Sequence, residues 1–87
     1  MRPAHYSTDI TAFGADALFV SALQRSDAPG ADQIRQVIDA AVRAFGYSGC
    51  AGRVAQEFGD HPEIAAARMR WARETLARLA FRVPLAA

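Results

Sequence analysis

A helical pattern of apolar residues between positions 31 and 45 constrains the fold more than any other feature of this sequence. Apolar side chains recur there at intervals of three, one, three, one and three residues, at Ile34, Val37, Ile38, Ala41, Val42 and Phe45. This spacing places them on one side of a helix. We find no stretch with the two-residue alternation of a half-buried strand. The sequence therefore predicts an all-α protein.

Further helices are predicted on either side of this one. Residues 15–25 carry an apolar face, and the Ser-Asp-Ala-Pro-Gly stretch at 26–30 ends the pattern with two strong helix breakers. Gly46 follows the helix at 31–45, where a left-handed residue commonly ends a helix. The next helix is expected at about 49–58, after a tight connection in which Ser48 is the N-cap.

The last helix is predicted from the residues at its start. Gly59 should end the preceding helix, and Asp60 is a suitable N-cap for the next. Pro62 and Glu63 fit a first turn, where a missing N–H is harmless and a carboxylate meets the positive end of the helix dipole. This helix should run to about residue 81, before Pro84. The expected fold is a small bundle of about four helices.

The length of 87 residues is enough for one small domain. We expect a flexible arm at 1–14, a single helical domain at 15–82 and a short tail at 83–87. Cys50 is the only cysteine, so an intramolecular disulfide is excluded. No apolar run approaches the roughly twenty residues that a membrane span needs, and the N-terminus lacks a signal-peptide pattern. The expected location is the cytoplasm, without membrane association.

Positive charge is concentrated in the last helix. Acidic and basic residues nearly balance over the whole chain, which has a formal net charge of +1. Residues 64–82 nevertheless have a net charge of +4, from Arg68, Arg70, Arg73, Arg78 and Arg82 against Glu74. The basic potential is therefore local to the last helix. The chain has no lysine, and GC-rich codon usage explains its arginines better than phosphate binding does.

Two large apolar residues fall outside the expected core face of this helix. At 100° per residue, the core face consists of Ala65, Met69, Ala72, Leu76 and Leu79. Ile64 and Trp71 lie away from it. Either they pack under the N-terminal arm or the first helix, or they form a partner-binding surface, since tryptophan is enriched in binding hot spots.

Residues 53–76 resemble the C-terminal, promoter-reading helix-turn-helix domain of sigma factors. The similarity rests on small and apolar positions around a central glycine, namely Val54-Ala55, Phe58-Gly59, Pro62-Glu63, Arg68-Met69, Ala72-Arg73 and Leu76. It extends over about residues 31–79. The resemblance implies a helix-turn-helix-like unit of three helices that binds DNA, with contacts from Arg68, Arg70, Arg73 and Arg78.

The positions that would face bases depart from this pattern. They are His61, Glu63, Ala66 and Ala67. Alanine cannot form the bidentate hydrogen bonds that read base edges. The acidic Asp60 and Glu63 lie at a helix start, where DNA-binding proteins usually hold a phosphate. The arginines could still contact phosphates, which positions a protein without specifying a sequence.

No arrangement of residues typical of an enzyme occurs in the chain. His5, His61 and Cys50 have no metal-ligand spacing. Cys50 fits a small buried position on a helix, so a catalytic thiol is not expected. Capping explains the neighbouring carboxylates Asp60 and Glu63 without catalysis. We also find no phosphate-binding loop or nucleophile motif. The sequence predicts a non-enzymatic protein without metal, cofactor or small-molecule ligand.

Two functional hypotheses follow. The first is a small bacterial transcription regulator that binds DNA through the helix at 60–78. The second is a protein–protein interaction module, expected to be homodimeric, that has the helix-turn-helix-like fold without DNA reading.

Overall fold

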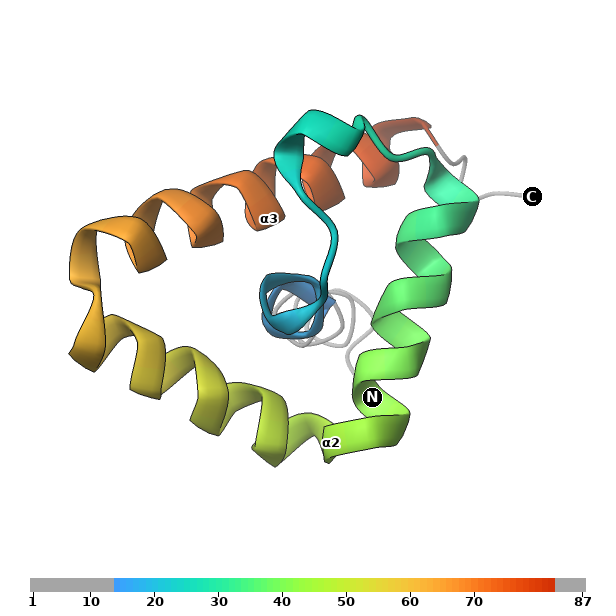
Figure 1. Ribbon diagram of the computed structural model, residues 1–87. Helices are drawn as coiled ribbons and strands as arrows, with labels where there is room; N and C mark the ends of the chain where they lie inside the picture. Colours follow the sequence, from blue (N-terminus) through green and yellow to red (C-terminus); the bar gives the residue numbers. More distant parts are fainter. Residues whose placement is uncertain (1–13, 83–87) are drawn as a thin grey trace, which may run out of the picture.

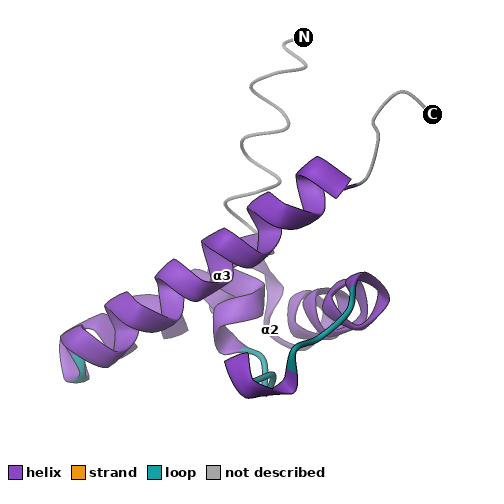
Figure 2. Ribbon diagram, turned by 90° about the horizontal axis from the view of Figure 1, so that it is seen from above, coloured by secondary structure: helices purple, strands orange, loops and turns teal. Residues whose placement is uncertain are grey.

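The computed structural model describes residues 14–82, and the side chains among them as far as residue 79. The predicted arm at 1–14, apart from Gly14, and the predicted tail at 83–87 lie outside the described residues. The described chain contains helices and loops and no strand (Figure 2). The all-α prediction is confirmed.

The described helices number three instead of the four expected. Residues 14–20 form a helical segment, called here the central helix. A short 3₁₀ turn, η1 (Arg25–Asp27), leads to α2 (Ala31–Asp60) and α3 (Pro62–Arg82). In Figure 1 the two halves of α2 and the whole of α3 surround the central helix on three sides.

The helices predicted at 31–45 and 49–58 form one element, α2, because no loop separates them. Only Gly46 has a non-helical backbone, with φ 74° and ψ 168°. Tyr47, Ser48 and Gly49 are already helical, so the predicted connection and the Ser48 N-cap are wrong. Glycine adopts a positive φ without the steric cost of a Cβ. One residue therefore suffices for the corner at which α2 changes direction (Figure 1).

The junction between α2 and α3 is also shorter than predicted. Gly59 and Asp60 are still helical, and His61 alone separates the helices. The His61 N–H donates to the Glu57 carbonyl at 2.7 Å, and its carbonyl accepts the Ala65 N–H at 2.8 Å. The predicted glycine stop and Asp60 cap are wrong because the following Pro62 disfavours helical backbone at His61, which has φ −142° and ψ 70°. Pro62 and Glu63 lie in the first turn of α3, as predicted.

The central helix ends at Val20, five residues before the predicted end. The Ser21 hydroxyl donates to the Leu18 carbonyl at 2.7 Å and accepts the Leu23 N–H at 3.3 Å, which turns the chain out of the helix. Ala28 has a left-handed φ of 46° just before Pro29 and Gly30. Residues 28–30 are non-helical before α2, but the predicted break at 26–30 does not end the central helix, which has already ended at Val20.

The hydrophobic core forms around the central helix. Its Ala15, Leu18 and Phe19 are buried, together with residues from the connection and from both longer helices: Leu23, Ile34, Ala65, Met69, Trp71 and Ala72. Leu76 and Leu79 pack against this cluster, so the predicted core face of the last helix is confirmed. Ala17, Ala41 and Cys50 form a second cluster of small side chains.

Candidate interaction groove

Arg68 is half-buried, with its guanidinium at the carboxyl end of the central helix. Its Nε–H donates to the Phe19 carbonyl at 3.0 Å, and Nη2 donates to the carbonyls of Ser21 and Leu18 at 2.9 and 3.3 Å. The last carbonyl groups of a helix lack partners within the helix, and a cation there also interacts favourably with the negative end of the helix dipole. Arg68, which we predicted as a DNA contact, therefore uses its donors to hold two helices of its own chain together.

Trp71 is buried beside this arginine. The Arg68 guanidinium lies 4.6 Å from the centre of the indole ring, and only 6% of Trp71 is exposed. Of the two alternatives for Trp71, packing against the first helix is the one observed, because the end of the central helix and the connection after it widen the buried side of α3. Burial also lowers the pKa of the Arg68 guanidinium from its ordinary value. Of the predicted pair of partner-binding residues, only Ile64 is exposed, at 70%.

The remaining predicted DNA contacts, Arg70, Arg73 and Arg78, are exposed on α3. Arg78 donates to the Thr75 hydroxyl at 3.4 Å. Arg73 is close enough to Asp16 of the central helix to affect its ionisation. Residues five positions apart on a helix point roughly 140° away from each other, so Arg73 and Arg78 lie on different sides of α3. The four arginines do not form a single basic stripe.

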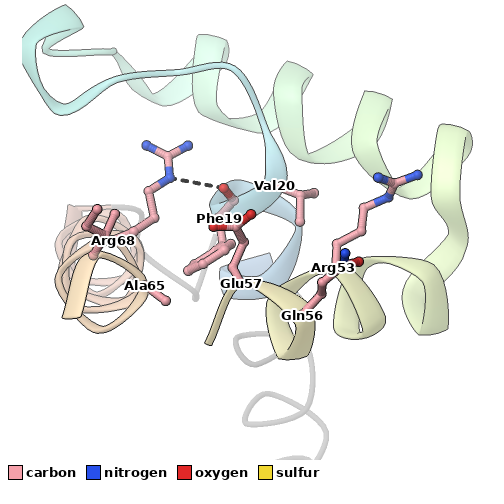
Figure 3. Close-up of a pocket in the computed structure, with 8 residues that line it drawn as sticks. Phe19, Val20, Arg53, Gln56, Glu57, Ala65 and Arg68 are labelled. Atoms are coloured by element: carbon pink, nitrogen blue, oxygen red, sulfur yellow. Dashed lines mark hydrogen bonds between the residues drawn. The ribbon is translucent and has the colours of Figure 1, made fainter. Parts of the chain in front are cut away.

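A groove opens where the central helix ends between the second half of α2 and the start of α3 (Figure 3). Its volume is about 420 Å³. Phe19, Val20 and Ala65 form an apolar floor, and Ile64 stands at the rim. Polar side chains also line it, namely Arg53, Gln56, Glu57 and Arg68. Grooves that combine apolar surface with a few polar groups are typical binding sites.

One wall of the groove carries charges of both signs. Arg53 and Glu57 are one helical turn apart on α2. The Arg53 guanidinium lies 3.8 Å from the centre of the Phe45 ring. Among the described residues, neither Arg53 nor Glu57 forms an ion pair; those that we observe join Arg35 to Asp32 and Arg43 to Asp39 in the first half of α2. The wall can therefore offer both a cation and a carboxylate to a bound segment.

Sequence reasoning did not identify most of this groove. Ile64 and Arg68 were singled out for other reasons, whereas Phe19, Val20, Arg53 and Glu57 were not. The i, i+4 spacing of Arg53 and Glu57 is visible in the sequence and marks an exposed wall. Their position relative to the start of α3 is set by the non-helical backbone of His61, the single residue between the two helices.

Cys50 is buried at 1% exposure, as its small helical position predicted. Its thiol contacts the Ala41 carbonyl, with 3.7 Å between sulfur and oxygen. Burial is the main cause that raises the pKa of this thiol, and the Asp16 carboxylate raises it further. Within residues 14–82, His, Cys, Asp and Glu side chains form no group of three that could hold a metal ion.

No family model, curated protein or solved structure matches this chain. None of the helices in the described part has the length and apolar character needed to cross a membrane.

Proposed function

We propose that this protein is a small non-enzymatic interaction module that binds a polypeptide segment in the groove between the central helix, α2 and α3. One observation carries this proposal: the 70% exposed Ile64 and the half-buried Val20 line the same groove as Arg53 and Glu57, which bear opposite charges. An apolar side chain of the bound segment would cover the floor. Its polar neighbours would pair with Arg53 and Glu57.

In this proposal the two halves of α2 and the whole of α3 would be the three helices of the helix-turn-helix-like unit. The second half of α2 and α3 would hold the central helix and shape the groove. Of the four positions expected to face bases, Glu63, Ala66 and Ala67 have no side-chain hydrogen-bond donor for base edges, and only His61 has one. Arg68, the basic residue nearest to them on α3, already donates to three carbonyl groups. Both features favour a protein ligand over DNA.

Selection of random peptides displayed on phage against the immobilised protein tests this function. Enriched peptides should combine an apolar residue with charged neighbours. They should bind Ile64→Glu at least about tenfold more weakly, since a carboxylate at the rim opposes apolar contact. Ala77→Glu adds the same charge at an exposed position of α3 outside the groove and should bind like the wild type. A selection without enrichment, or with peptides that bind Ile64→Glu equally well, contradicts the proposal.

DNA binding is the second candidate, favoured by the exposure of Arg70, Arg73 and Arg78 on one helix. Contacts of these arginines with phosphates would give sequence-independent, salt-sensitive binding. Random duplex DNA at low salt is the appropriate probe. Arg70→Ala and Arg73→Ala should each weaken binding, whereas Arg43→Ala, which removes a cation already paired with Asp39, should have less effect. Absence of retention at low salt would end this candidate.

A further inference from the structure

We infer that the segment bound in the groove is the groove region of a second copy of this chain, so that the protein forms a symmetric dimer. This inference rests on the proposed function and names its partner. In a dimer with a two-fold axis, the same surface of each subunit meets itself, and any contact made by one copy is repeated by the other. The groove region satisfies this requirement in both shape and charge.

The first observation is that a protruding apolar side chain stands beside an apolar hollow. Ile64 is 70% exposed at the rim, and the floor of Phe19, Val20 and Ala65 begins next to it. A two-fold axis near the rim would place Ile64 of each copy over the floor of the other. Ile64 and the half-buried Val20 of each copy would then be removed from water, which favours association, whereas Phe19 and Ala65 are already buried within one chain.

The second observation concerns the charged wall. Arg53 and Glu57 lie one turn apart on the same helix, and neither forms an ion pair within the described chain. When this helical turn packs antiparallel against its copy across a two-fold axis, Arg53 of each chain faces Glu57 of the other. The wall is thus complementary to itself. An unrelated partner would need a matching pair of charges, whereas a second copy always carries it.

The third observation concerns the core that the described residues form. Leu18 and Cys50 are the largest side chains among the described residues that are completely buried. The Phe58 ring stacks on the floor residue Phe19 with 6.2 Å between centroids, yet 38% of Phe58 remains exposed. A chain of this length buries a limited part of its surface by itself. Contact between two grooves would extend this core.

Sedimentation equilibrium over a range of protein concentrations at low salt tests the inference. The wild type should show a monomer–dimer equilibrium that weakens as salt is added. Arg53→Glu and Glu57→Arg each place like charges opposite each other twice in the dimer, and each should raise the dissociation constant by about tenfold or more. The double variant Arg53→Glu/Glu57→Arg restores opposite charges and should recover most of the affinity.

Two controls separate this effect from misfolding and from other surfaces. Recovery in the double variant excludes misfolding as the cause of the losses, and circular dichroism checks each variant directly. Arg70→Glu reverses a charge on the outer side of α3 and should leave the dissociation constant unchanged. Ile64→Ala should raise it.

A wild type that remains monomeric at every concentration overturns the inference, as does a dimer that tolerates both single reversals. The oligomeric state, read together with the peptide selection, separates the inference from the proposed function. If the wild type is monomeric but captures displayed peptides in a manner that depends on Ile64, the groove binds a different polypeptide and only the homodimer is refuted. If neither occurs, both proposals are wrong.

Discussion

The Arg68 Nε–H of α3 donates to the Phe19 carbonyl at 3.0 Å and so joins the last helix to the end of the central helix, 49 residues earlier in the chain. Two further donations from the same guanidinium, to the carbonyls of Leu18 and Ser21, complete this arrangement. An arginine that the sequence suggested as a DNA contact thus stabilises the fold. The same contact fixes the position of Phe19, and with it the floor of the groove.

Removal of these donors should destabilise the protein. Arg68→Met keeps an unbranched side chain that can cover Trp71 but leaves three carbonyl groups without this donor. We expect the free energy of unfolding, measured by urea denaturation, to fall by about 2–3 kcal/mol. Arg70→Met, at an exposed position without a hydrogen bond among the described residues, should change it by less than about 0.5 kcal/mol. Equal stability of Arg68→Met and the wild type would show that the carbonyl contacts contribute little.

The corner of α2 should depend on glycine at position 46. A Cβ there meets no atom within 4 Å, so any cost of Gly46→Ala arises from the backbone φ of 74° alone. We expect a loss of about 1–3 kcal/mol in thermal or urea unfolding. Gly52→Ala is the matched control, because Gly52 is exposed, helical and equally open to a Cβ. Gly52→Ala should increase the free energy of unfolding by about 0.5–1 kcal/mol. A loss of stability comparable to that of Gly46→Ala would refute the backbone explanation.

The Cys50 thiol should be protected from reagents while the protein is folded. It is 1% exposed, which restricts access of the reagent. Its pKa is raised, mainly by burial, which lowers the fraction of reactive thiolate at neutral pH. Labelling with a chromogenic disulfide should be slow in buffer and rapid in denaturant. The variant Cys50→Ala/Ala51→Cys moves the thiol to an exposed neighbouring position and should react rapidly in both conditions. Rapid labelling of the folded wild type would contradict the burial.

Asp16 should make the stability of the protein depend on pH. Burial raises the pKa of its carboxyl above the ordinary value of 3.8, while attraction by Arg73 lowers it to a smaller extent. The folded state therefore binds the proton more tightly than the unfolded state. The resulting stabilisation is fully present below 3.8 and is lost as the pH rises through the folded pKa.

Asp16→Asn, which cannot ionise, should therefore be more stable than the wild type at neutral pH. Its advantage should decrease as the pH approaches 3.8 from above. Thermal melts across this range measure the difference, and Asp60→Asn at an exposed position is the control. A neutral-pH destabilisation by Asp16→Asn would indicate that its contact with Arg73 outweighs the cost of burial.

Local patterns in the sequence determined where helices form and which side of each is buried. The apolar spacing at 31–45 and the face running from Ala65 to Leu79 both predicted their elements, because burying one face of a helix requires that period. Pro62 and the break at 26–30 acted through backbone restrictions that hold in any fold. The sequence also placed Cys50 in the interior, since a small apolar side chain on a helix face fits there.

Only the tertiary structure decided how these helices meet and what their polar side chains do. Arg68 and Arg70 look alike in the sequence, yet one closes the central helix and the other is exposed, because the end of that helix lies against one side of α3. Trp71 is buried for the same reason. The groove likewise depends on long-range packing: it forms where Phe19 and Val20 of the central helix lie against α2 and α3, far from these residues in the sequence.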